Sequence, residues 1–169
     1  MADERWWTQI GFYQVSNYCS RRWFLVEFWM WDFLNRRWGQ MNTDERRLEL
    51  NEITEKIIGC AFKVGNSLGY GFLEKVYENA LVYELRKTGM LVEPQFTIYV
   101  HYEAIIVGKF IPDVLVERAV LVELKAIKSL GERETAQCLN VIKATKITIC
   151  LLINFGNPKV EIKRIVHNF

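Results

Sequence analysis

Histidine is scarce in this sequence, and cysteine occurs in no recognisable pattern. Only His101 and His167 are present among the 169 residues, which counts against a histidine-rich metal site. The four cysteines are far apart and form no C-x-x-C pair, so they suggest neither a zinc site nor a disulfide framework. They are Cys19, Cys60, Cys138 and Cys150. We expect them to be reduced, buried side chains of a cytoplasmic protein.

Long apolar runs and a strong net charge are also missing. No run of about 18 apolar residues occurs, so no membrane-spanning helix is indicated and we expect no membrane partner. The formal net charge of +2 argues against a large non-specific contact with nucleic acid. With 50% hydrophobic and 25% charged residues, the composition is typical of a globular domain with its own core.

Tryptophan is confined to one end of the chain: all six tryptophans lie within the first 38 residues. Residues 23–34 could form an apolar helix that binds a membrane surface or a partner, although the segment is too short and too charged to span a bilayer. We favour a simpler interpretation, in which residues 1–41 are a Trp-rich extension outside the core. Residues 42–169 then form the domain, with Met41 as its effective start.

From Asn42 onward the spacing of apolar residues predicts an α/β domain. Asn42 or Thr43 can cap a first helix. Its apolar residues at helical spacing are Leu50, Ile53, Ile57, Cys60, Ala61 and Val64. A second helix is expected over residues 72–87, with Val76, Ala80 and Tyr83 on one face, and a third over 131–145. Strand-like runs cover residues 91–100, 102–107, 110–117, 120–126, 147–153 and 160–166.

The most informative stretch is Ile111-Pro112-Asp113, followed by Glu123-Leu124-Lys125. The runs 114–116 and 120–122 are rich in β-branched residues and flank three other residues, which predicts a hairpin. If Val116 pairs with Val120, Asp113 lies opposite Glu123, with Cβ atoms about 4.5–5.5 Å apart. Strand side chains alternate with period two, so Lys125 shares that face. A register slip of one residue would scatter the three side chains.

This register predicts a metal site. Two carboxylates so close repel each other unless a cation lies between them, and Mg²⁺ suits such oxygen ligands. We expect the ion between Asp113 and Glu123, together with the carbonyl of Leu124. Each short motif alone is common on solvated strands, so the prediction rests on their combination.

Six short motifs, in order, closely resemble those of the prokaryotic GxxExxY proteins, which are grouped with the PD-(D/E)XK nuclease-like superfamily. They are Gly71–Tyr77, which fits G-x-x-E-x-x-Y, Tyr83–Lys87, Val122–Ala126, Ala136–Gln137, Lys143–Thr145 and Leu151–Gly156. The resemblance covers roughly residues 44–169 and leaves out the Trp-rich extension. It implies a restriction-endonuclease-like α/β core, a mixed β-sheet flanked by helices, with an acidic site at one edge.

The resemblance also implies roles for individual residues. Asp113 and Glu123 would bind Mg²⁺ or Mn²⁺, and Lys125 would position or activate the attacking water. Glu74 would complete the acidic cluster, and Gln137 of the third helix would brace the site. The implied activity is that of a Mg²⁺-dependent phosphodiesterase acting on DNA, with RNA as an alternative substrate.

Three positions depart from the family pattern. Gly65 and Glu134 stand where histidines are common, and Tyr70 stands where a proline is common. These departures keep two alternatives open, a nucleic-acid-binding module that has lost turnover and a protein-interaction module that keeps the fold. The sequence does not indicate the oligomeric state.

Removal of the extension tests the domain boundary. A chain that begins at Met41 is expected to unfold at nearly the same temperature as the full chain, because the tryptophans of the extension match nothing in the resemblance. Scanning calorimetry of the two proteins measures the difference. A loss of several degrees, which corresponds to about 1 kcal/mol or more, would show that the extension packs on the domain.

Overall fold

The structure is a computed structural model that describes residues 39, 41–145 and 147–167. The Trp-rich extension and Cys19 lie outside these described residues, so the boundary at Met41 remains a prediction. In the described part of the chain, no helix is long and apolar enough to cross a membrane.

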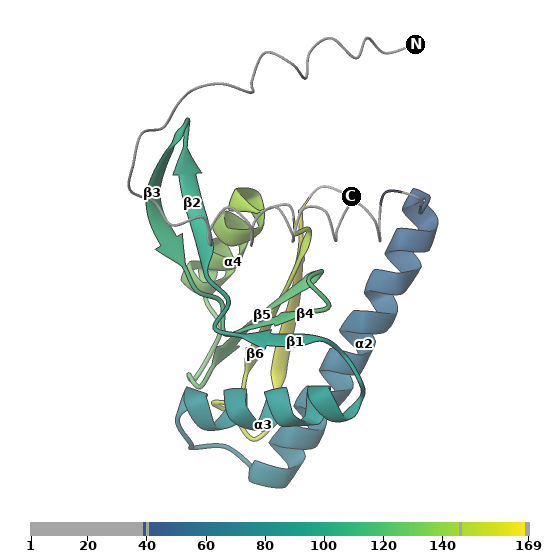
Figure 1. Cartoon of the computed structure of the whole chain (residues 1–169). Coiled ribbons are helices and arrows are strands. Elements are labelled where there is room, and N and C mark those ends of the chain that lie inside the picture. The colour runs from purple at the N-terminus through teal and green to yellow at the C-terminus, as the bar shows by residue number, and fades with distance from the viewer. Residues whose placement is uncertain (1–38, 40, 146, 168–169) are drawn as a thin grey trace, which may run out of the picture. The chain divides into compact units, whose positions relative to one another are not determined.

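The described elements form an α/β domain, as predicted (Figure 1). Their order is α2 (Thr43–Leu68), α3 (Glu74–Lys87), β1 (Val92–Pro94), β2 (Ile98–Tyr102), β3 (Ile105–Phe110), β4 (Val114–Val116), β5 (Val120–Lys125), α4 (Glu132–Ala144), β6 (Ile149–Asn154) and β7 (Glu161–Val166). Five strands precede α4 rather than the four expected. The predicted strand over 91–100 is split at Gln95, which has a positive φ of 55°.

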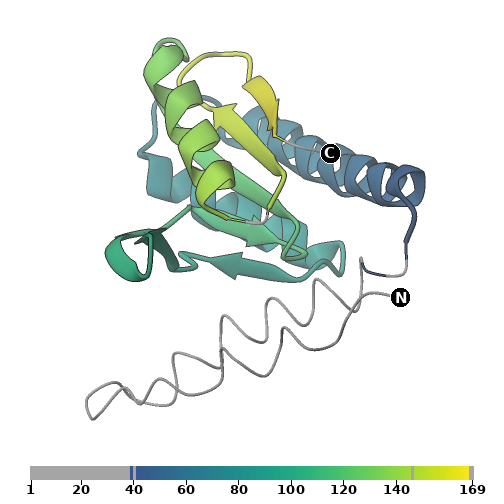
Figure 2. The same cartoon turned by 90° about the horizontal axis from the view of Figure 1, so that it is seen from above.

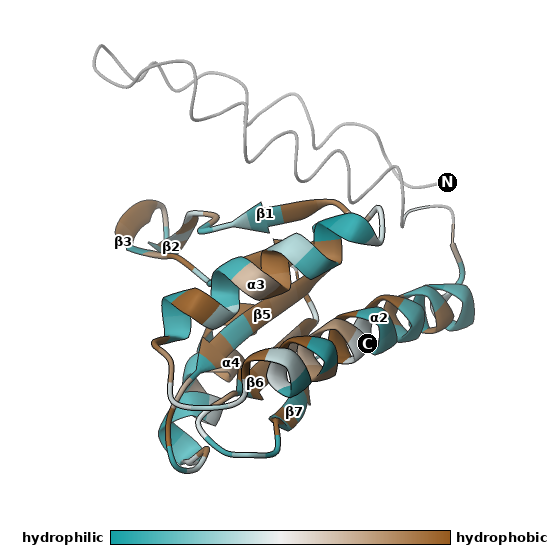
Figure 3. Cartoon of the chain, turned by 90° about the horizontal axis from the view of Figure 1, so that it is seen from below, coloured by the Kyte–Doolittle hydropathy of each residue, from teal (hydrophilic) through white to brown (hydrophobic). Residues whose placement is uncertain are grey.

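The main sheet has the strand order β1-β4-β5-β6-β7 and is mixed. β5 and β6 run parallel, and the other neighbouring pairs are antiparallel. Residues from α2 and α3 pack on one face, and residues from α4 pack on the other (Figure 2). Both faces of β5 and β6 are therefore covered, which explains their nearly continuous apolar sequence (Figure 3).

The first two helices differ in how well their sequences predicted them. Asn42 caps α2 through a reciprocal pair of hydrogen bonds with Glu45, and all the apolar residues predicted for its inner face are buried. In α3 the expected apolar face is wrong, because Val76 and Tyr83 are exposed. The buried face carries Tyr77, Leu81 and Leu85 among others.

Tyr77 explains this orientation of α3. Its ring is fully buried and stacks on Phe155, with ring centroids 4.6 Å apart. Its hydroxyl donates to the carbonyl of Gly69 at 3.0 Å and accepts from the N–H of Phe72 at 3.2 Å. The tyrosine of the G-x-x-E-x-x-Y motif thus fixes the loop before α3 and the rotation of the helix.

The hairpin of β4 and β5 has the predicted register, with Val116 paired to Val120. Its turn places Glu117 and Arg118 at positive φ, and the N–H of Ala119 donates to the carbonyl of Val116 at 3.0 Å. Both turn residues also hold the edge strand. Leu91 and Glu117 exchange two hydrogen bonds of 2.9 Å, and Arg118 forms a 2.8 Å ion pair with Glu93 on β1.

The end of β6 is tied to the loop that follows β5. The fully buried side chain of Asn154 accepts from the N–H of Ile127 at 3.0 Å and donates to its carbonyl at 2.8 Å. It also accepts from the N–H of Gly156 at 3.0 Å. A Cβ on Gly156 would lie 2.1 Å from the carbonyl oxygen of Ile127, so only glycine fits there. This contact gives the Leu151–Gly156 motif a structural role.

The three described cysteines, Cys60, Cys138 and Cys150, are buried and free, as expected. Burial raises the pKa of the Cys60 thiol. These thiols therefore act as small core side chains.

Asn154→Ala is expected to lower the free energy of unfolding by about 2–4 kcal/mol, because it removes a fully buried amide and leaves the half-buried N–H and carbonyl of Ile127 without their partners. Urea denaturation followed by circular dichroism measures the loss. Asn157→Ala is the matched control, since this amide donates a single exposed hydrogen bond of 2.8 Å to the Lys128 carbonyl. Equal losses in both variants would contradict the special role of Asn154.

Candidate active site

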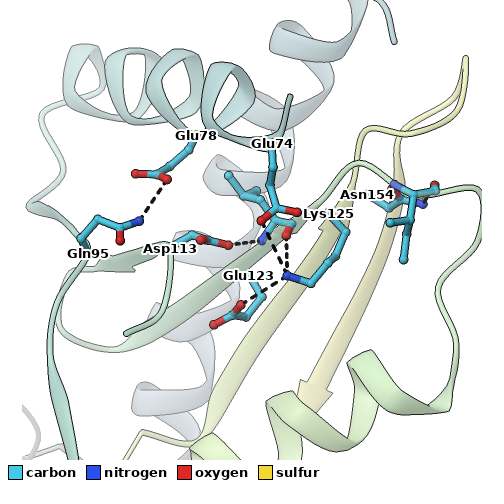
Figure 4. A network of polar contacts seen from close by, with 9 residues as sticks. Glu74, Glu78, Gln95, Asp113, Glu123, Lys125 and Asn154 are labelled. Atoms are coloured by element: carbon cyan, nitrogen blue, oxygen red, sulfur yellow. Dashed lines mark hydrogen bonds and ion pairs between the residues drawn. The ribbon is translucent and has the colours of Figure 1, made fainter. Parts of the chain in front are cut away.

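Asp113, Glu123 and Lys125 come together at the sheet as the register requires (Figure 4). Asp113 directly precedes β4, and the β4–β5 register continued by one pair places it opposite Glu123. Its Oδ2 atom accepts from the backbone N–H of Leu124 at 2.7 Å. This hydrogen bond holds the carboxylate against the neighbouring strand.

Lys125 lies between carboxylates from two different elements. Its Nζ atom is 3.8 Å from Oε2 of Glu123 and 3.9 Å from Oε1 of Glu74. It also donates to the carbonyl of Leu124 at 2.8 Å. Lys125 ends β5 and Glu74 begins α3, so the amine links the sheet to the helix of the G-x-x-E-x-x-Y motif.

Glu123 is the most buried of the three carboxyls of Glu74, Asp113 and Glu123. Its residue exposure is only 4%, and its Oε1 atom is buried without a hydrogen-bond partner among the described residues. Burial, followed by repulsion from Asp113, raises the pKa of this carboxyl to about 8. An ionised Glu123 therefore needs a positive partner beyond the distant ammonium of Lys125.

The two neighbouring carboxyls are shifted in the same direction. Burial raises the pKa of Asp113, against the opposing hydrogen bond from Leu124. Burial likewise raises the pKa of Glu74, where the field of Lys125 opposes the shift and that of Asp113 adds to it. Three carboxyls thus surround one amine, and bringing a cation among them would relieve their repulsion.

A fourth carboxylate, on Glu78, is connected to Asp113 through Gln95. Glu78 is buried and pairs with Lys75 at 2.5 Å and with Nε2 of Gln95 at 3.0 Å. The backbone N–H of Gln95 then donates to the carbonyl of Asp113 at 3.0 Å. Sequence analysis missed Glu78 and Gln95. The signal for Glu78 was its position four residues after Glu74, which puts both on one side of α3.

The donor atoms suit a hard cation in kind. Asp113, Glu123 and the Leu124 carbonyl supply oxygen atoms, which hard cations prefer. Oε1 of Glu123 has no hydrogen-bond partner among the described residues, and a cation would provide one. The geometry is not a ready-made metal cage, however. Within residues 41–145 and 147–167, no three side chains of His, Cys, Asp or Glu are gathered so that they could hold a metal ion. The four-ligand set with Glu74 therefore remains a prediction.

Gln137 lies outside this network. It is exposed on α4 and lines a separate cavity, and no hydrogen bond joins it to Asp113, Glu123 or Lys125 among the described residues. Its predicted role as a brace stays a prediction.

Gly65 and Glu134, where the resemblance to the GxxExxY proteins leads us to expect histidines, both make local structural contacts. A Cβ on Gly65 would lie 2.3 Å from Cγ2 of Val160, so a larger residue would require that valine to move. The side chain of Glu134 accepts from the N–H of Gly131 at 2.9 Å at the start of α4. This bond lowers the pKa of Glu134. Both residues therefore serve local packing or capping.

A mixed sheet covered by helices on both faces, with an Asp, a Glu-x-Lys and a helix glutamate at one place, defines a restriction-endonuclease-like core. The model of the PD-(D/E)XK nuclease superfamily matches residues 51–165, and the chain belongs to this superfamily. The narrower resemblance to the GxxExxY proteins stays a prediction. No curated protein and no solved structure matches the chain.

The raised pKa of Glu123 predicts a pH-dependent stability. The folded state binds this proton more tightly than the unfolded chain, whose glutamate pKa is about 4.3. The contribution of Glu123 to the free energy of unfolding should therefore be fully present below about pH 4.3 and be lost as the pH rises towards about 8. In EDTA at pH 8–9, the free energy of unfolding of Glu123→Gln should exceed that of the wild type by roughly 1 kcal/mol or more, and its melting temperature should be higher.

That difference should narrow as the pH falls towards about 5, where the wild-type carboxyl holds its proton. Glu103→Gln, in the exposed turn between β2 and β3, is the control and should show no such trend. A stabilisation by Glu123→Gln that is the same at every pH would refute the buried, repelled carboxyl.

Proposed function

We propose that this domain is a Mg²⁺-dependent phosphodiesterase that cleaves DNA and accepts Mn²⁺ as a substitute. The observation that carries the proposal is the buried, unpartnered Oε1 of Glu123 beside a second carboxylate and a lysine. Membership of a nuclease superfamily supports the same reaction class. The buried, free thiols support a reducing, cytoplasmic location.

The carboxylates of Asp113 and Glu123, with the carbonyl of Leu124, would hold the ion. The chemistry supplied by a bound Mg²⁺ is a lower pKa for a bound water and neutralisation of charge on a phosphoryl oxygen. Glu123 must lose its proton before it can bind, so its pKa of about 8 makes binding favour alkaline solution.

Lys125 is the group that meets the substrate. Its ammonium is already held by the Leu124 carbonyl and by two carboxylates, so it needs little reorganisation to face an incoming phosphate. A compact ammonium can stabilise the charge that grows on phosphate oxygens during cleavage. Glu74, at the start of α3, would hold this ammonium in place through their 3.9 Å ion pair.

One observation favours the alternative of a binding module without turnover. The Leu124 carbonyl and Oδ2 of Asp113 already have partners inside the protein, and the described residues contain no preformed three-residue metal cluster. A domain that stayed in this state would keep the fold and lack the ion that cleavage requires.

Lys125→Ala is expected to remove DNA cleavage while leaving metal binding largely intact, because the lysine acts on the phosphate and not on the ion. Asp113→Asn is expected to abolish both. Calorimetric titration with Mn²⁺ measures binding, and plasmid, linear and single-stranded DNA measure cleavage. Lys125→Arg should not restore activity, since a planar guanidinium cannot replace an ammonium in this crowded place.

Lys128→Ala is the matched control, because it removes an exposed lysine three residues along the chain that makes none of these contacts. It should cleave at close to the wild-type rate. Equal cleavage by all the variants would identify a contaminating nuclease. A wild type that binds Mn²⁺ and DNA but cleaves nothing would establish the alternative of a binding module.

A further inference from the structure

A cavity of about 500 Å³ separates α4 from the hairpin of β2 and β3. Its lining is mostly apolar and includes no residue of the acidic group. The lining residues from the hairpin are Ile98, Val100 and Phe110. The residues from α4 recur every three or four positions along one stripe, from Arg133 to Ala144.

The hairpin forms an open apolar floor. Ile98 pairs with Phe110 across the two strands, and Val100 pairs with Gly108. An added Cβ on Gly108 would meet nothing within 4 Å, so the space beside Val100 is free. The half-buried ring of Phe110 is the aromatic surface in this floor. A flat apolar ligand could therefore lie against it.

The α4 side of the cavity supplies polar groups at its rim. Arg133, Gln137 and Asn140 are exposed there, and the structure gives them no hydrogen bond to the hairpin. A guanidinium can pair with a phosphate, and side-chain amides can bond the donor and acceptor edge of a base. An aromatic floor with amides and an arginine at its edge suits a nucleotide better than a purely apolar ligand.

The cavity is connected to the acidic site through the base of the hairpin. Gln95, before β2, donates its backbone N–H to the carbonyl of Asp113, after β3, at 3.0 Å. Phe110 precedes Asp113 by three residues, so their Cα atoms are at most roughly 11 Å apart. In a DNA duplex one strand rises about 3.4 Å per nucleotide along the axis, so a few nucleotides cover that distance. One strand could place a phosphate at Asp113 and a nearby base in the cavity.

Resting on the proposed function, we propose that this cavity binds an unpaired nucleobase of the DNA strand that is cleaved. The base stacks on Phe110, and the amides of Gln137 and Asn140 bond its edge. Arg133 pairs with the adjoining phosphate. The domain then prefers single-stranded DNA, or a strand with a displaced base, over an intact duplex, in which the bases are stacked and paired.

The test distinguishes the contribution of the bases to binding from that of the phosphate backbone. A fluorescein-labelled single-stranded oligodeoxynucleotide is compared with an abasic strand of the same length, which has the same phosphates. Fluorescence anisotropy is measured in EDTA, so that binding is independent of turnover. The wild type should bind the strand with bases at least about fivefold more tightly, the lower end of what stacking of a base on an aromatic ring provides.

Phe110→Leu should bring this affinity ratio close to one. Tyr102→Leu is the matched control, since it removes an exposed aromatic residue of the same hairpin that does not line the cavity, and it should keep the ratio. Gln137→Ala changes an exposed position and should lower the ratio without loss of folding. Its melting temperature, measured beside that of Phe110→Leu, separates an effect on binding from an effect on folding.

A wild-type ratio of one would overturn the proposal, even if the protein cleaves DNA. An equal reduction by Tyr102→Leu and Phe110→Leu would also overturn it. A retained ratio in a protein that cleaves nothing would support the base site while refuting the proposed cleavage. Sedimentation of Gln137→Ala reports its oligomeric state. If this variant changes the oligomeric state and not the affinity for either strand, the cavity is an interface between copies of the chain and the proposal fails.

Discussion

The register of β4 on β5 is the constraint on which the site depends. It places Asp113 and Glu123 side by side. The hydrogen bond from the N–H of Leu124 to the carboxylate of Asp113 then holds Asp113 against β5. The parallel strand β6 then holds β5 from the other side, and Asn154 holds the loop beyond Lys125. A shift of one residue would turn Asp113 away from Glu123 and disperse the charges around Lys125.

Much of this arrangement was readable from the sequence because it is set locally. The β-branched runs around a three-residue loop determine the hairpin, and alternation along a strand determines which side chains share a face. The cap of α2 at Asn42 and its buried residues follow from the same kind of short-range pattern. Glu123 and Lys125 lie on β5 and Asp113 directly precedes β4, so the proximity of these three could be predicted without knowledge of the rest of the fold.

Other features depend on partners far along the chain, and the sequence did not reveal them. The rotation of α3 is decided by the stacking of Tyr77 on Phe155, which is 78 residues away in the chain numbering, and not by the apolar pattern of the helix itself. The chain turns at Gln95, and β2 and β3 are thereby separated from the main sheet. Gln95 has a positive φ, and the sequence has no glycine there that would indicate such a turn. Glu78 could enter the core only because Lys75 and Gln95 pair with it.

The turn between β4 and β5 shows how one part of the sheet governs another. Glu117 and Arg118 are unfavourable choices for positive φ, and Asn-Gly would adopt this backbone with less strain. Their side chains instead fasten β1, the edge strand, through Leu91 and Glu93. The turn therefore gains its compensating contacts only after the chain following α3 has reached the sheet. The hairpin turn and the sheet edge therefore stabilise each other, and the geometry of the acidic site depends on the edge strand as well as on the hairpin.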